Sequence, residues 1–207
     1  RDRLRSRGLG DVYKRQLTNH LKHYKTDKMN KAIIAIDSFK GCLTSEEAGS
    51  AVMEGIKTIF PDCETLLFPI ADGGEGMLDI LTSATKGKYR TLPAHGPLME
   101  LVQGRYGISG GGQTALIEMA AVSGLPLVPE DKRNPMLTTT YGTGELILDA
   151  LEQGCRHFIV GIGGSATNDA GLGMLQALGF RFLDKRGNLL GTGGRIMSQV
   201  ASIDTSA

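Results

Sequence analysis

Four short segments of the sequence place glycines beside carboxylate, hydroxyl, amide or ammonium groups. The richest is residues 162–169, IGGSATND, whose glycines and polar side chains are Gly163, Gly164, Ser165, Thr167, Asn168 and Asp169. Capping a helix needs one such polar side chain and not four, so this turn is predicted to hold a ligand. The Asp169 carboxylate could accept a proton from an attacking hydroxyl or hold Mg²⁺, and Asn168 could orient the substrate.

The second segment, residues 71–76 (ADGGEG), sets two carboxylates among three glycines. Gly73 and Gly74 leave the backbone bare, so the loop could admit a substrate or a hydrated metal. Because Mg²⁺ prefers one or two carboxylates together with phosphate and water oxygens, Asp72 and Glu75 are candidate metal ligands beside a nucleotide. An acidic turn that only begins a helix would show the same pattern.

The other two segments are predicted to handle anions. Residues 37–41 (DSFKG) combine the Asp37 carboxylate, the Ser38 hydroxyl and the Lys40 ammonium. An ammonium near a helix N-terminus attracts phosphate or carboxylate, since the exposed N–H groups and the helix dipole add to its charge. Residues 138–145 (TTTYGTGE) offer hydroxyls and glycines just before a predicted helix, with Thr143 among them. Ordinary turn and capping roles would explain both segments equally well.

Alternating strands and helices are predicted to position these segments. The predicted strands are residues 32–36, 65–70, 157–162 and 180–183, and residues 114–120 are predicted to be a further strand or a buried segment. The predicted helices are residues 48–59, 77–84, 143–153 and 174–178. Thr44 and Glu47 form a T-x-x-E capping box before the first helix. The run AIIAI is dense enough for a strand buried on both faces. This order indicates an α/β fold with a largely parallel sheet, in which ligands bind at the carboxyl ends of the strands.

Composition and charge exclude several classes of protein. With 41% hydrophobic and 22% charged residues the 207-residue chain is globular, and its 29 glycines are about twice ordinary usage. Residues 29–207 carry 14 Lys and Arg against 19 Asp and Glu and no Trp, which argues against nucleic-acid binding. No apolar run approaches the roughly 20 residues that span a bilayer. The three cysteines lack a CxxC spacing, so we expect a cytoplasmic protein without a disulfide framework or zinc site.

The two ends of the chain differ from the rest. Residues 1–28 hold nine Lys and Arg against three Asp and Glu, without a helical or strand period. The stretch RDRLRSRGLGDVYKRQ is typical of translated library or adapter sequence, so residues 1–28 are predicted to be a non-native leader and Met29 the native start. A transit peptide or a basic nucleic-acid arm is the alternative. The uncapped ending IDTSA predicts a chain cut within a domain.

A dinucleotide-binding pattern is also present in loose form. Residues 161–166 match G-x-G-x-x-A, and Asp184 lies 20 residues after Gly164, behind a predicted strand. This match leaves open an NAD-dependent oxidoreductase, and a non-catalytic binding module is a further alternative. No G-x-x-x-x-G-K-[ST] segment occurs, which excludes a P-loop NTPase.

Together, the segments DSFKG, PIADGGEG, TALIEMAAVSGL, TTTYGTGELI and GIGGSATNDAGLGMLQALG resemble the bacterial glycerate kinases, collinearly from about Lys31 to the last residue. That family phosphorylates D-glycerate with ATP, mostly to 2-phosphoglycerate. The resemblance implies two α/β domains, one of them Rossmann-like and discontinuous, with the active site in the cleft between them. Residues 29–70 would be the first segment of the Rossmann-like domain, and residues 71–207 an incomplete second domain.

The resemblance also implies Mg-ATP as phosphoryl donor and D-glycerate as the small-molecule partner. Our hypothesis is direct phosphoryl transfer, in which Asp169 activates or orients the glycerate hydroxyl and Lys40 neutralises phosphate or carboxylate charge. Asp72 and Glu75 would serve Mg²⁺, and Asp72 and Asp169 could exchange roles. Further predicted contacts to substrate or nucleotide are Asp37, Ser38, Gly73, Gly74, Thr143, Gly163, Gly164, Ser165 and Asn168. Such chemistry depends on positioning and charge stabilisation more than on covalent participation.

Overall fold

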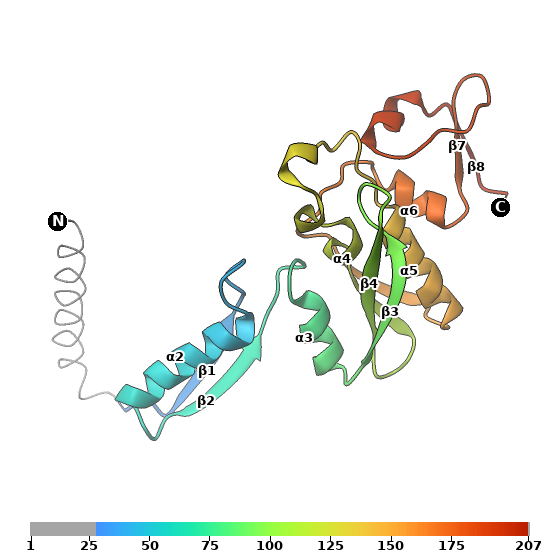
Figure 1. Ribbon diagram of the computed structural model, residues 1–207. Coiled ribbons are helices and arrows are strands. Elements are labelled where there is room, and N and C mark those ends of the chain that lie inside the picture. Colours follow the sequence, from blue (N-terminus) through green and yellow to red (C-terminus); the bar gives the residue numbers. More distant parts are fainter. Residues whose placement is uncertain (1–27, 207) are drawn as a thin grey trace, which may run out of the picture. The chain divides into compact units, whose positions relative to one another are not determined.

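The computed structural model describes residues 28–206, so the predicted leader lies outside the described residues apart from Lys28. The chain divides into two compact units (Figure 1). Of the described residues, the first unit comprises those up to Ala35 together with Gly49–Phe68, and the second comprises Ile36–Ala48 and those from Pro69 onward.

The first unit is a strand, helix, strand segment. Its elements are β1 (Lys31–Ile36), α2 (Ser45–Ile59) and β2 (Glu64–Pro69), except that the first turn of α2, up to Ala48, and the end residues Ile36 and Pro69 belong to the second unit. β1 pairs with β2 in a two-stranded sheet. The predicted capping box precedes α2. The Glu47 N–H donates to Thr44 Oγ1 at 3.2 Å, and the Thr44 N–H donates to the Glu47 carboxylate at 2.8 Å. Two backbone donors are thus satisfied reciprocally, which confirms this local prediction.

Within the described residues, β1 is not buried on both of its faces as predicted. Ile34 is only 6% exposed, but Ile33 is 66% exposed, and Phe68 on β2 is 53% exposed. An apolar strand is buried on both faces only where other elements pack against both of them. In the described residues, the sheet of β1 and β2 leaves these two side chains uncovered.

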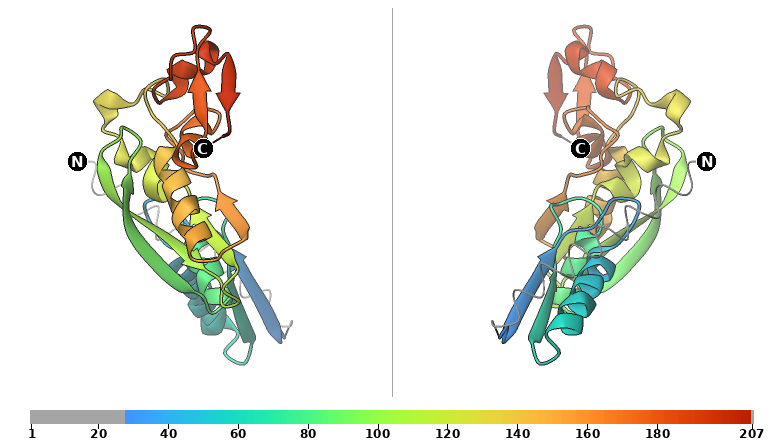
Figure 2. Two further views of the ribbon diagram at one scale, coloured as in Figure 1. Left: turned by 90° about the vertical axis from the view of Figure 1, so that its right-hand side faces the viewer. Right: turned by 90° about the vertical axis from the view of Figure 1, so that its left-hand side faces the viewer.

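The second unit is built on a four-stranded sheet with the order β3-β4-β5-β6 (Figures 1 and 2). Its strands are β3 (Lys88–His95), β4 (Leu101–Ile108), β5 (Thr114–Glu118) and β6 (His157–Gly161). β3 and β4 are antiparallel, β4 and β5 are antiparallel, and β5 and β6 are parallel. The sheet is therefore mixed, which corrects the prediction of a largely parallel sheet.

Two glycines explain why the hairpin over residues 88–108 went unpredicted. Gly104 and Gly107 occupy opposite faces of β4, where side chains would otherwise show the alternation of a strand. A Cβ at Gly104 would lie 2.9 Å from Leu146 of α5, whereas a Cβ at Gly107 would meet the Thr82 side chain of α3. The same contacts show that α3 and α5 cover opposite faces of the sheet.

Helices and short segments complete the second unit (Figure 2). They are α3 (Met77–Ala84), α4 (Ala120–Ser123), α5 (Tyr141–Glu152), α6 (Leu172–Ala177), β7 (Arg181–Leu183), β8 (Ser202–Asp204) and 3₁₀ turns at Leu125–Leu127, Glu130–Lys132 and Gly194–Gln199. Residues buried in the core are Ala94, Tyr106, Ile108, Ala115, Ile117, Val122, Leu146, Ala150 and Cys155. No helix in the described part of the chain has the length and apolar character to cross a membrane.

A charged cluster joins α5 to the β3–β4 hairpin. The Asp149 carboxylate accepts bonds from Arg90 Nε at 2.6 Å, Arg90 Nη2 at 3.0 Å and the Tyr106 hydroxyl at 2.6 Å. The Arg90 guanidinium holds the pKa of Asp149 below its ordinary value of 3.8. Burial and the Asp149 carboxylate together raise the pKa of the fully buried Tyr106.

We expect Asp149→Ala to lower the free energy of unfolding by about 3 kcal/mol, because it leaves two donors without their charged acceptor. Urea unfolding measures this loss, with Glu152→Ala on the exposed face of the same helix as the control. Because the folded-state pKa of Asp149 is lowered, its contribution is present above the unfolded value of 3.8 and is lost as pH falls through the folded-state pKa. The variant should therefore lose less stability on acidification than the parent. Equal free energies of unfolding for D149A and E152A would show that the cluster does not stabilise the fold.

Candidate functional site

The candidate site lies at the carboxyl edge of the parallel strand pair β5 and β6. Glu118, the last residue of β5, is the ladder partner of Gly161, the last residue of β6. The Met119 N–H donates to the Gly161 carbonyl at 3.0 Å, so the segments that follow β5 and β6 begin next to each other. Ligands of α/β sheets bind at such strand ends, and the IGGSATND turn begins here as predicted.

Two of the predicted glycine segments meet at this edge. The Gly163 N–H donates to the Gly73 carbonyl at 3.0 Å. A Cβ at Gly163 would lie 2.6 Å from Gly74 Cα, and a Cβ at Gly161 would lie 2.5 Å from the Gly73 carbonyl oxygen. The ADGGEG and IGGSATND turns therefore pack backbone against backbone, at a separation that only glycine permits.

The carboxylates of the ADGGEG turn remain accessible. Asp72 and Glu75 are both exposed, and Asp72 Oδ1 accepts one internal bond, from the Gly74 N–H at 3.1 Å. Gly73 has a φ of 92° and open space where a Cβ would stand. Exposed carboxylates beside bare backbone suit a hydrated Mg²⁺ with phosphate oxygens. Among the described residues, no three or more His, Cys, Asp or Glu side chains are grouped to hold a metal ion by themselves.

The polar side chains of the IGGSATND turn differ in their surroundings. Ser165 Oγ and Thr167 Oγ1 lie 2.8 Å apart, and the Thr167 N–H donates to Ser165 Oγ at 3.0 Å. Asn168 is exposed, while the Gly164 carbonyl accepts a bond from the Leu125 N–H at 2.9 Å. Asn168 is thus the exposed polar side chain of this turn, whereas Ser165 and Thr167 are half-buried and bonded to each other.

Asp169 occupies a different environment from the rest of its turn. Its side chain is 1% exposed, and its carboxylate accepts bonds from both the N–H and the hydroxyl of Thr140, at 2.8 and 3.0 Å. The Thr139 hydroxyl donates at 3.3 Å, the Gly171 N–H at 3.1 Å and the Gly173 N–H at 3.2 Å. This carboxylate joins the segment before α5 to the start of α6, and its acceptor positions are used inside the protein.

Thr143 is likewise committed to packing. It is 1% exposed, and its hydroxyl lies 2.8 Å from the hydroxyl of Ser123, which is fully buried at the end of α4. The predicted phosphate contact through Thr143 stays a prediction; in the described residues its hydroxyl is buried between two helices. A threonine one turn into an amphipathic helix carries no sequence signal that distinguishes these two roles.

Lys40 lies at the tip of a tight turn. The Phe39 N–H donates to the Leu43 carbonyl at 2.8 Å and the Leu43 N–H donates back at 3.1 Å, so the chain reverses over the intervening residues. Lys40 is exposed there and forms no ion pair within the described range 28–206. Asp37 Oδ1 accepts a bond from the Ser38 N–H at 2.7 Å.

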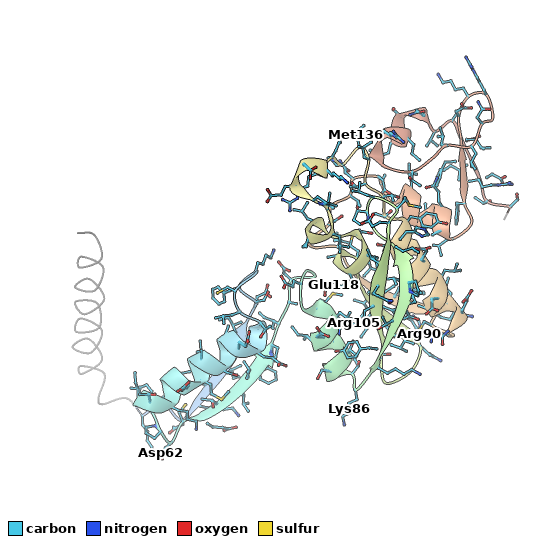
Figure 3. The ribbon with its side chains drawn as sticks, in the orientation of Figure 1. Asp62, Lys86, Arg90, Arg105, Glu118 and Met136 are labelled. Atoms are coloured by element: carbon cyan, nitrogen blue, oxygen red, sulfur yellow. The ribbon has the colours of Figure 1, made fainter. Side chains whose placement is uncertain are left out.

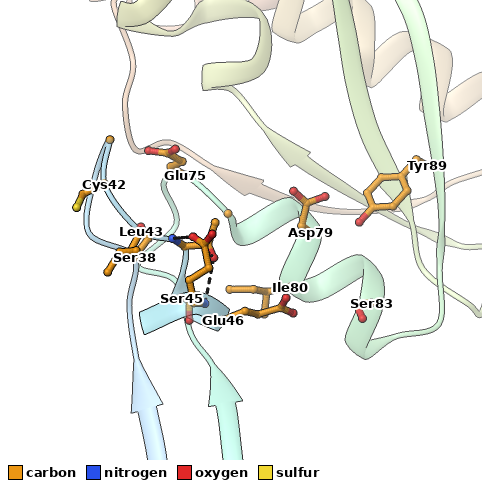
Figure 4. A pocket seen from close by; sticks show the side chains of 14 residues that line it. Ser38, Cys42, Leu43, Ser45, Glu46, Glu75, Asp79, Ile80, Ser83 and Tyr89 are labelled. Atoms are coloured by element: carbon orange, nitrogen blue, oxygen red, sulfur yellow. Dashed lines mark hydrogen bonds between the residues drawn. The ribbon is translucent and has the colours of Figure 1, made fainter. Parts of the chain in front are cut away.

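A cavity of about 580 Å³ in the second unit contains two of the predicted site residues, Ser38 and Glu75 (Figure 4). Its acidic lining side chains are Glu46, Glu47, Glu75 and Asp79, and Lys40 is not part of the lining. Among the described residues no lysine or arginine lines this cavity, and Asp79 is paired with Arg105 at 2.8 Å.

Glu118 was missing from the predicted site residues. It is half-buried, and its Oε2 accepts a bond from the Leu78 N–H at 3.3 Å, in the first turn of α3. Burial is the main cause of its raised pKa, to which the Asp79 and Glu75 charges add. The sequence signal that could have identified it is a single carboxylate ending an otherwise apolar strand, at the edge where ligands bind.

The second unit is a mixed α/β unit with two glycine turns packed at the carboxyl ends of a parallel strand pair. Strand ends of this kind are where α/β proteins bind ligands. The chain belongs to the glycerate kinase family, whose model matches residues 32–207.

The Asp184 carboxylate accepts bonds from the Arg186 and Asn188 N–H groups, at 2.8 and 2.9 Å, within its own turn. It therefore has a local turn role, and the oxidoreductase alternative is not favoured.

Curated relatives match most of this chain. The chain is 54% identical over 176 residues to glycerate kinase of Bacillus subtilis (strain 168) and 51% identical over 176 residues to glycerate 2-kinase of Escherichia coli (strain K12). Each match covers 85% of this chain and 46% of the relative. A crystal structure from Salmonella typhimurium LT2, provisionally named glycerate kinase 2, matches with a TM-score of 0.73 and 48% identity, over 86% of this chain and 48% of that one. The chain thus spans about half the length of these relatives.

Proposed function

We propose that the whole protein, of which this chain is a part, is a cytoplasmic kinase that transfers the γ-phosphoryl group of ATP to D-glycerate, giving 2-phosphoglycerate. The observation that carries this proposal is the contact between Gly73 and Gly163, which joins two glycine turns at the carboxyl edge of β5 and β6. The curated glycerate kinases named above are about half identical to this chain across that region.

In this proposal the two turns hold the nucleotide and the metal. Glu75 would hold Mg²⁺, which supplies charge neutralisation for the transferring phosphoryl group when it is bound. Gly73, Gly74, Gly163 and Gly164 leave the backbone open to phosphate oxygens. Further contacts to substrate or nucleotide are proposed for Asp37, Ser38, Ser165 and Asn168, and the exposed Lys40 would neutralise phosphate or carboxylate charge.

We propose that Asp72, rather than Asp169, accepts the proton of the glycerate hydroxyl. In that role Asp72 would not be a metal ligand, and Glu75 would hold Mg²⁺. Asp72 is exposed and accepts one internal hydrogen bond, so it has acceptor positions free for a substrate. Asp169 is buried and already accepts bonds from five donor groups. A general base must reach the proton that it removes, and Asp169 is therefore proposed as a positioning residue.

We further propose that residues 29–70 are the first segment of a discontinuous, Rossmann-like domain and residues 71–207 part of a second α/β domain. A two-stranded sheet is marginally stable by itself in water. The exposure of Ile33 and Phe68 on β1 and β2 supports a larger sheet in the whole protein, with further elements covering these side chains.

The decisive experiment measures D-glycerate-dependent release of ADP with Mg²⁺, using the complete protein alongside the 207-residue chain. Conversion of the product by enolase distinguishes 2-phosphoglycerate from 3-phosphoglycerate. We expect turnover from the complete protein and none from the short chain. If the complete protein releases no ADP with D-glycerate, the proposed substrate is wrong, and release with another hydroxy acid would identify the replacement.

A further inference from the structure

Glu118, labelled in Figure 3, ends β5 opposite Gly161, the last residue of β6. Its ladder partner Gly161 is the residue whose Cα faces the Gly73 carbonyl. It is therefore the one side chain of β5 placed directly beside the junction of the ADGGEG and IGGSATND turns.

The start of α3 depends on this carboxylate. The first N–H groups of a helix have no partner within the helix and need an acceptor from elsewhere. Gly76 precedes α3 with a φ of 89° and offers no side-chain cap. Glu118 Oε2 instead accepts the Leu78 N–H at 3.3 Å, across 40 residues of sequence. A residue of the neighbouring strand thus supplies the cap that the ADGGEG turn cannot supply.

The charges around Glu118 are acidic. Within residues 28–206 it forms no ion pair with a lysine or arginine. Glu75 and Asp79 are the charged groups of the adjoining turn and helix that act on it, and Asp79 is paired with Arg105 at 2.8 Å. The raised pKa of Glu118 indicates that this environment disfavours its charge. An amide oxygen at the same position can still accept the Leu78 N–H.

We propose that Glu118 is a positioning residue of the phosphoryl-transfer site, which holds the ADGGEG turn against the IGGSATND turn by capping α3 from the adjacent strand. The expected effect of Glu118 on turnover rests on the proposed function. The structural part, the cap itself, stands whatever the substrate is.

The test compares two replacements of similar volume, one of which keeps the acceptor oxygen. Glu118→Gln keeps an oxygen that can accept the Leu78 N–H, and Glu118→Leu removes the acceptor at similar volume. Hydrogen exchange of the 207-residue chain reports the cap directly, and turnover of the complete protein reports its effect on the site. Glu130→Ala, at a carboxylate whose side chain is 89% exposed, is the control.

In E118L we expect the amides of residues 73–78 to exchange at least 10-fold faster while β3 and β4 keep their protection. Its turnover should fall by about 100-fold, since small displacements of a positioned site have effects of that size. E118Q and the control should stay within a few-fold of the parent in both measurements. If E118L does not fold, E118Q still tests the proposal, because it must keep both slow exchange and turnover.

Two results would overturn the proposal. Unchanged exchange at residues 73–78 in E118L would show that the cap does not hold the turn. Normal exchange with lost turnover in E118Q would show that the charge itself is needed, which assigns Glu118 to the chemistry. If the complete protein does not phosphorylate D-glycerate at all, the exchange measurement still decides whether the cap exists, so the two failures are distinguishable.

Discussion

An Asp169→Asn variant is expected to lose its activity because the α5–α6 region loses stability. The carboxylate accepts three backbone N–H groups, those of Thr140, Gly171 and Gly173, together with two threonine hydroxyls. An asparagine amide presents an NH₂ group where one oxygen stood, so it faces a backbone donor with a donor. Hydrogen bonds to a charged group contribute about 1.5–3 kcal/mol each, and we expect a total loss of about 3–5 kcal/mol.

Chemical unfolding of D169N and the parent measures this loss, and hydrogen exchange at residues 139–144 and 171–174 locates it. Asp131→Asn is the matched control, because Asp131 is exposed, and surface changes of this kind stay within about 0.5 kcal/mol. A D169N protein with parental stability and little turnover would reverse the assignment, making Asp169 the group that acts on the substrate hydroxyl.

The second large effect is expected from Gly163→Ala. The new Cβ would lie 2.6 Å from Gly74 Cα and 2.9 Å from Gly74 N, and neither backbone atom can move aside as a side chain could. The two glycine turns must therefore separate. Overpacking of this kind costs about 1–3 kcal/mol, and displacing a site by about 1 Å can cost 100-fold in rate.

Turnover of the complete protein with D-glycerate, measured where the variant is still fully folded, tests this expectation. Gly111→Ala is the control, because no atom lies within 4 Å of the position that its methyl group would take, and its φ is ordinary. Equal turnover of G163A and G111A would show that the contact between the turns has no part in catalysis.

The features predictable from the sequence are those that neighbouring residues determine. The capping box of Thr44 and Glu47 and the helix over residues 77–84 match the structure, and the strand predicted over residues 157–162 ends one residue earlier, at Gly161. Their signals are capping side chains and apolar spacing, which act over one or two turns of chain. The contacting glycines of both turns were also among the predicted site residues.

Strand pairing could not be predicted in the same way. The β3–β4 hairpin makes the sheet mixed, and its alternation is hidden at Gly104 and Gly107, where neighbouring helices fill the space of a side chain. Which strands pair depends on which faces can be covered, and that depends on residues far away in the chain.

The roles of the carboxylates were decided only by the tertiary structure. Asp72 and Asp169 are the same residue type in similar glycine-rich turns, and nothing in their neighbouring residues separates a free carboxylate from a saturated one. The donors to Asp169 include Thr140, 29 residues earlier, and the donor to Glu118 lies 40 residues earlier. Folding brings those donors to one carboxylate and leaves another open to solvent, because a hydrogen bond depends on distance in space and not on separation along the chain.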